Sequence, residues 1–123
     1  LLSMPSVFIR KAAKDHGTKK MVEGGDVVGK KVLLIEDLVT TGGSSLHGVT
    51  ELRKAGAVVK DCLVIVGYEL QEAKEAFEKE NVRLTQLTDV NTILAVAEEM
   101  GKITEANKKI VSEWLKNPRE WKG

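Results

Sequence analysis

The sequence contains a single cysteine, Cys62, among its 123 residues, so no disulfide can form within the chain, and a reducing compartment is expected. An excess of charge of either sign is also missing, because 18 Asp and Glu residues balance 19 Lys and Arg residues. The chain therefore has no overall field for attracting nucleic acid or anionic lipid. No apolar run approaches the roughly 20 residues of a membrane span, and the first residues lack the basic start and cleavage site of a signal peptide. We predict a cytoplasmic protein that binds neither membranes nor nucleic acid.

The composition is that of one globular domain. Hydrophobic residues make up 42% of the chain and charged residues 30%, close to the average for soluble domains, and the length allows one ordinary domain. The first residues, LLSMP, include no methionine at position 1 and resemble the end of a helix followed by a loop. We therefore expect a single domain over residues 1–123 that is incomplete at its N-terminus.

Apolar runs alternate with amphipathic stretches along the chain. Apolar and β-branched runs predict strands over residues 7–9, 31–36, 58–66 and 82–87. Helical spacing predicts helices over residues 44–55, 71–80, 89–100 and 104–117, with Ser44 or Ser45 capping the first, and Asp89 and Thr104 opening the last two. Continuous apolar residues over 31–36 indicate burial on both faces, whereas the alternation over 82–87 is typical of an edge strand, and residues 10–28 are expected to form a loop. This order predicts an α/β fold with an open, mostly parallel sheet flanked by helices.

Three stretches follow the carboxyl ends of predicted strands, where open parallel sheets bind their ligands: residues 10–25, 36–45 and 67–70. In the second stretch, Gly42 and Gly43 permit a backbone curl whose N–H groups face an anion, and a helix N-terminus follows. The hydroxyl groups available to phosphate oxygens belong to Thr40, Thr41, Ser44 and Ser45. The second stretch therefore has the composition of a phosphate-binding loop.

Two acidic residues, Glu36 and Asp37, precede this loop. Carboxylates repel phosphate but accept hydrogen bonds from sugar hydroxyls, so the stretch suits a ribose 5-phosphate. The alternative is a strand–turn–helix junction with an ordinary cap. The stretch is neither a Walker loop nor the glycine fingerprint of dinucleotide-binding folds.

The first stretch is rich in positive charge. Residues 10–20 contain five Lys and Arg residues, one histidine and one acid. On composition alone, this stretch also fits a solvated loop or a weak nucleic-acid patch, although no aromatic residues are interleaved for base stacking. Cations beside a phosphate loop stabilise the charge that develops on departing pyrophosphate.

The two stretches together resemble the type I phosphoribosyltransferases. The sequence IEDLVTTGGS at 35–44 looks like the motif of this family that binds phosphoribosyl pyrophosphate (PRPP). The sequence RKAAKDHG at 10–17 resembles the mobile catalytic loop of the orotate phosphoribosyltransferases, and TKKMVEG at 18–24 resembles the version found in enzymes related to UMP synthase. The resemblance has the family's order and spacing and extends over nearly the whole chain.

The resemblance implies transfer of phosphoribosyl from PRPP to orotate, giving orotidine 5′-phosphate and pyrophosphate, with Mg²⁺ arriving on PRPP and no metal site of the protein's own. It implies a homodimer with shared active sites. The catalytic residues would be Lys14, His16 and Asp37, and Thr40 would lie near the base. The residues that would bind PRPP are Arg10, Lys11, Lys14, His16, Glu36, Asp37, Leu38, Val39, Thr40, Thr41, Gly42, Gly43 and Ser44.

Two features depart from the family pattern. Orotate enzymes usually carry an Asp-Arg pair whose arginine binds the orotate carboxylate, whereas this chain has Gly67, Tyr68, Glu69 and Leu70. The family's N-terminal portion is also missing, which implies a fragment, a split enzyme or an inactive relative. A sheet without that portion would expose an apolar edge and face, which favours oligomerisation.

Three other functions remain as alternatives: a phosphoribosyltransferase for another base, a non-catalytic module that binds PRPP or a nucleotide, and a nucleic-acid binder that uses the basic loop. The remaining residues of interest are expected to be structural. His47 is expected at the surface or in packing, Cys62 in the core, and Trp114 and Trp121 against the last helix.

Overall fold

The computed structural model describes residues 4–10 and 21–121. Its main feature is a parallel sheet in the order β3-β4-β5. The strands are β3 (Lys31–Val39), β4 (Val58–Gly67) and β5 (Arg83–Asp89), and the helices are α1 (Gly43–Lys54), α2 (Gln71–Lys79), α3 (Val90–Glu99) and α4 (Glu105–Lys116). The predicted α/β fold with a parallel sheet is confirmed, and β5 is an edge strand as expected.

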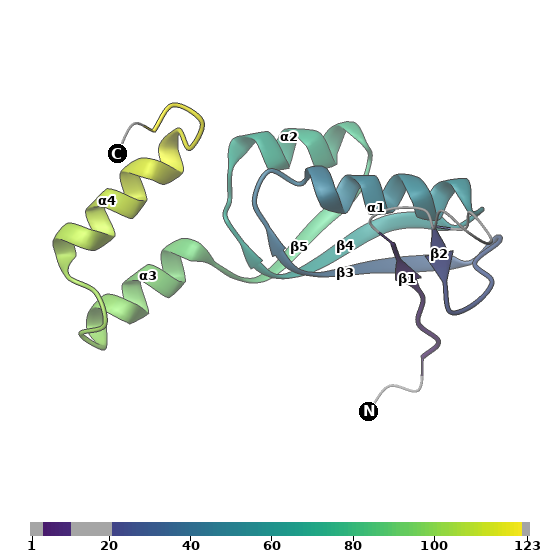
Figure 1. Ribbon diagram of the computed structural model, residues 1–123, viewed down its shortest axis with the longest axis horizontal. Coiled ribbons are helices and arrows are strands. Elements are labelled where there is room, and N and C mark those ends of the chain that lie inside the picture. The colour runs from purple at the N-terminus through teal and green to yellow at the C-terminus, as the bar shows by residue number, and fades with distance from the viewer. Residues whose placement is uncertain (1–3, 11–20, 122–123) are drawn as a thin grey trace.

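Helices α1 and α2 lie together on one face of the sheet (Figure 1). Val49 and Leu52 of α1 and Phe77 of α2 are fully buried there against Val59 and Val64 of β4. The spacing of these residues places them on the inward face of each helix. Burial of each such side chain stabilises the fold by about 1.5–3 kcal/mol. The packed layer of helices and sheet therefore fixes where the carboxyl ends of the strands lie.

The other face of the sheet carries exposed apolar side chains. Ile35 is 66% exposed and Leu87 is 68% exposed, and Leu33 and Ile65 are each half exposed. The predicted burial of the strand over 31–36 on both faces is therefore wrong, because α1 and α2 pack on the same side of the sheet. The expectation of an exposed apolar face is confirmed. A hollow of about 620 Å³ lies along it, lined by Leu33 and Leu63 among others.

The segment before the parallel sheet contains a second, antiparallel pair of strands. Strand β1 (Phe8–Ile9) pairs with β2 (Val22–Glu23), and β2 lies within the region that the sequence predicts as a loop. The first predicted strand is therefore not part of the parallel sheet, and Phe8 is 72% exposed. Ile9 packs on α1 where Gly48 leaves room, since a Cβ atom there would lie 3.1 Å from the Ile9 Cδ1 atom.

The last two helices form a hairpin beyond the carboxyl ends of the strands (Figure 1). Both helices begin at the predicted capping residues: Asp89 accepts a hydrogen bond from the N–H of Thr92, and Thr104 accepts one from the N–H of Asn107. Neither helix contains a buried residue. Within the described ranges, we find no helix whose length and apolar character would let it cross a membrane.

Candidate phosphate-binding site

A sharp turn joins β3 to α1 at the candidate phosphate loop. Gly42 in this turn has φ +83°, a left-handed conformation that favours glycine. It also lies against the core, because an added Cβ atom would be 2.8 Å from Cε2 of Phe77. Glycine is therefore required at this position for its backbone conformation and for space, and the predicted curl is present.

The N-terminus of α1 is open to an anion. No side chain caps this helix and its first turn contains no acidic residue, whereas Asp89 and Thr104 cap the last two helices. The first N–H groups of a helix have no partner within the helix, and the helix dipole favours negative charge beside them. Thr40, Gly43 and Ser44 are exposed around this end. The arrangement fits a phosphate group.

Three details of the predicted loop are corrected. Strand β3 continues to Val39 and α1 begins at Gly43, so the predicted loop over 37–43 is shorter. Neither Ser44 nor Ser45 caps the helix, because the N-cap is Gly42. Ser45 is 2% exposed, since the earlier helix start turns it toward the core, and its hydroxyl cannot reach a ligand.

Both acidic residues lie within β3, including Asp37, which the sequence predicts just beyond the strand. Successive residues of a strand point to opposite faces, and Asp37 is exposed while Glu36 is half-buried. Asp37 Oδ1 accepts a hydrogen bond from the N–H of Leu38 at 2.7 Å. Asp37 is therefore the carboxylate that is more open to a sugar hydroxyl.

Glu36 also affects the core beside it. Burial raises the pKa of the Cys62 thiol to about 11, and the negative charge of Glu36 adds to this effect.

The other predicted PRPP ligands are divided between the core, the surface and the part of the chain outside the description. Val39 is 2% exposed, so only its backbone is available to a ligand, whereas Leu38 is partly exposed. Thr41 is half-buried. Lys11, Lys14 and His16 lie outside the described residues.

Arg10, the first residue of the basic stretch, is held in place by two contacts. Its Nε atom lies 2.8 Å from Oε1 of Glu23, and its backbone N–H donates to the carbonyl oxygen of Met21 at 2.9 Å. The segment between Arg10 and Met21 therefore begins and ends at one place, the β1–β2 pair. Sequence reasoning missed this ion pair, because a two-residue strand leaves too short a pattern to detect.

The stretch over 67–70 lies beside the phosphate loop. Gly67 pairs with Val39 in the sheet, and the N–H of Tyr68 donates to the carbonyl oxygen of Val39 at 3.0 Å. Glu69 has φ +57° and accepts a hydrogen bond from Nε2 of Gln86 at 3.0 Å. The sequence identifies this stretch by its place after a strand, but the involvement of Gln86 has no local signal.

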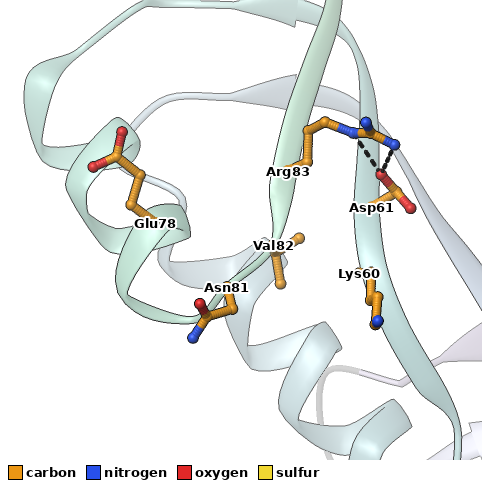
Figure 2. A pocket seen from close by; sticks show the side chains of 6 residues that line it. All are labelled: Lys60, Asp61, Glu78, Asn81, Val82 and Arg83. Carbon is orange, nitrogen blue, oxygen red and sulfur yellow. Dashed lines mark hydrogen bonds and ion pairs between the residues drawn. The ribbon is translucent and has the colours of Figure 1, made fainter.

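A polar hollow of about 480 Å³ lies at the opposite end of the sheet, where β4 and β5 begin (Figure 2). Arg83 and Asp61 line it and form an ion pair, with Nη2 and Oδ1 2.6 Å apart. This hollow contributes nothing to the phosphate loop, which lies at the carboxyl ends. Within residues 4–10 and 21–121, no three His, Cys, Asp or Glu side chains gather to hold a metal ion.

Comparisons with known proteins agree on one group of enzymes. No protein-family model matches the chain. Orotate phosphoribosyltransferase from Bacillus caldolyticus is 40% identical over 120 residues, which cover 98% of this chain and 58% of that protein. The chain thus spans less than two thirds of the length of this curated relative.

Solved structures share the fold. UMP synthase from Leishmania donovani superposes with a TM-score of 0.79 over 93% of this chain and 24% of that chain, at 24% identity. Orotate phosphoribosyltransferase from Mycobacterium tuberculosis H37Rv in complex with PRPP superposes with a TM-score of 0.61, at 30% identity, over 71% of this chain and 48% of that chain. These comparisons bear out the resemblance predicted from the two motifs: relatives 40% identical over nearly the whole chain are named orotate phosphoribosyltransferase, and the chain has the type I phosphoribosyltransferase fold.

Proposed function

We propose that this chain carries the PRPP-binding part of an orotate phosphoribosyltransferase, which transfers phosphoribosyl from PRPP to orotate in pyrimidine biosynthesis. The observation that carries the proposal is the uncapped N-terminus of α1 behind the turn at Gly42, with the exposed carboxylate of Asp37 nearby in the preceding strand. The relative from Bacillus caldolyticus and the PRPP complex of the Mycobacterium tuberculosis enzyme support it.

The roles of the residues follow from charge. The 5-phosphate of PRPP binds the N–H groups of the loop over 40–44, and the ribose hydroxyls donate to Asp37 with support from Glu36. Lys14 and His16 stabilise the pyrophosphate that leaves, and His16 donates a proton. Mg²⁺ enters as part of the substrate, bound to the phosphates of PRPP. Arg10 joins them only by sharing or releasing Glu23.

Turnover is tested by mixing the chain, orotate, PRPP and Mg²⁺ and following the loss of orotate absorbance. We expect turnover that disappears in Lys14→Ala. PRPP binding is measured separately by calorimetry. Asp37→Asn should weaken PRPP by about 1.5–3 kcal/mol, the scale of a hydrogen bond to a charged group. The matched control is Asp26→Asn, in the loop before β3, which should leave PRPP affinity unchanged. Equal affinities for both variants and the unaltered chain would refute the assignment of Asp37.

A second candidate function rests on the stretch over 67–70, which has no arginine to pair with the orotate carboxylate and carries the carboxylate of Glu69. It is phosphoribosyl transfer to a base that lacks a carboxylate. Turnover with such a base but not with orotate would favour it. PRPP binding without turnover of any base would instead favour a non-catalytic PRPP-binding module.

We also propose that the chain associates with a second copy of itself in the cytoplasm. The support is the exposed apolar face of the parallel sheet, to which β3, β4 and β5 contribute Ile35, Ile65 and Leu87 in turn. Continuous apolar surface of this kind is costly to leave in water. In the homodimer, the basic stretch of one copy acts in the active site of the other.

A further inference from the structure

Two strand ends meet at the edge of the candidate site. Val39 of β3 and Gly67 of β4 are register partners, and the N–H of Tyr68 donates to the carbonyl oxygen of Val39 at 3.0 Å. Thr40 and Tyr68 are therefore the first residues beyond two neighbouring strands. Both strand ends lie at the edge of the sheet where β3 leads into the turn at Gly42.

Helix α4 reaches back to this edge from the end of the chain. The rings of Tyr68 and Trp114 are in edge contact, with centroids 6.0 Å apart and planes at 80°. Arg119, which follows α4, makes two contacts with Glu72 of α2, at 2.6 Å and 3.1 Å. The hairpin of α3 and α4 lies beyond the carboxyl ends of the strands (Figure 1). The aromatic pair and the ion pair thus hold the C-terminal end of the chain against Tyr68 and against the start of α2.

The backbone around Tyr68 is held in an unusual conformation. Glu69 has φ +57°, which is uncommon for a residue other than glycine. Gln86 donates to its carboxylate, and Gly67 leaves the room that Gln86 needs, because an added Cβ atom would be 2.0 Å from its Oε1 atom. Conformations of this kind persist where the surrounding structure over-determines them, and they concentrate at ligand sites.

We propose that Tyr68 forms one wall of the site for the base and that Trp114 is the positioning residue that holds its ring there. The inference rests on the proposed function, which places a ribose phosphate at the neighbouring loop. The stretch over 67–70 offers no cation, so the planar base is recognised by the face or edge of an aromatic ring rather than by an ion pair. The C-terminal helix thereby takes part in choosing the base.

The test compares two ligands that share the sugar phosphate and differ in the base. Calorimetry measures the affinity of the full chain for ribose 5-phosphate and for orotidine 5′-phosphate, and their ratio isolates the contribution of the base. Tyr68→Ala should lower the affinity for orotidine 5′-phosphate about tenfold, the scale of one aromatic–base contact, and leave that for ribose 5-phosphate within about twofold. Trp114→Ala should reduce the same ratio by a smaller factor, and Trp114→Phe should restore it.

Two further variants separate positioning from loss of structure. Trp121→Ala is the matched control, because Trp121 is on the surface beyond α4, and it should leave the ratio unchanged. Arg119→Gln releases the end of α4 without opening the core and should lower the ratio in the same direction as Trp114→Ala. An unchanged ratio in Tyr68→Ala, with ribose 5-phosphate still bound, would overturn this inference alone. Failure of the unaltered chain to bind ribose 5-phosphate would overturn the proposed function, and this inference with it.

Discussion

Replacing Gly42 with alanine tests how firmly the candidate phosphate loop is built into the core. The left-handed backbone at Gly42, with φ +83°, costs a residue that has a Cβ atom about 1–2 kcal/mol. The added atom would also lie 2.8 Å from Cε2 of the fully buried Phe77, and overpacking of this kind costs about 1–3 kcal/mol. We therefore expect Gly42→Ala to lower the free energy of unfolding by about 2–5 kcal/mol.

The adjacent glycine supplies the control. A Cβ atom at Gly43 would meet nothing within 4 Å, and Gly43 is the first residue of α1, where alanine is favoured by up to about 1 kcal/mol. Urea unfolding followed by far-UV circular dichroism should show Gly43→Ala to be neutral or stabilising. In the double variant Gly42→Ala/Phe77→Leu, the clashing ring is absent but the backbone strain at position 42 remains. This variant should therefore recover part of the free energy of unfolding that Gly42→Ala loses. Equal stability of Gly42→Ala and Gly43→Ala would refute the reasoning.

Three other predictions concern the core, a helix cap and the exposed apolar face of the parallel sheet. Because the pKa of Cys62 is raised to about 11 from an ordinary 9.0, folding stability should fall as the pH rises above 9, and the native thiol should resist a thiol reagent at pH 8; fast labelling of the native chain would contradict this. Hydrogen bonds from Thr92 lower the pKa of Asp89 from its ordinary 3.8, so the charged carboxylate stabilises α3 above pH 3.8 and ceases to do so as the pH falls through the lowered pKa. The urea midpoints of the unaltered chain and of Asp89→Asn should therefore converge in acid. A difference between the two midpoints that increased in acid would contradict the direction of this pKa shift. Leu87→Lys, on the exposed apolar face of the sheet, should reduce self-association measured by sedimentation. The control variant is Lys74→Leu in α2, which should change self-association less. An unchanged sedimentation profile for Leu87→Lys would exclude this face from the proposed contact between copies.

The elements that the sequence predicts well are those whose determinants are local. Helices α2, α3 and α4 form where apolar spacing and capping residues predict them, because residues three and four apart in the chain share a helix face. The phosphate loop is equally local, since Gly42 and the helix start that follows lie within a few residues. Asp89 and Thr104 cap their helices for the same reason.

The elements that the sequence predicts poorly depend on distant partners. Pairing of Leu38 and Val39 with β4 carries β3 past the two acidic residues, and only this pairing decides that Asp37 lies in a strand. The side of the sheet that the helices cover decides whether Ile35 is buried, and an apolar residue type is the same in either case. Strand β2 likewise exists because β1 lies beside it.

The sequence by itself determined the residue types of the candidate site: the order of acids, hydroxyls and glycines that suits a sugar phosphate, and with it the resemblance to the phosphoribosyltransferases. The tertiary structure alone decided which of those groups a ligand can reach, since it buries Ser45, half-buries Glu36 and pairs Arg10 with Glu23. It also brought Trp114 to Tyr68, from which it is 46 positions distant in the chain. Residue type and local spacing are properties of the chain, whereas burial and long-range contact exist only after the sheet and its helices have packed together.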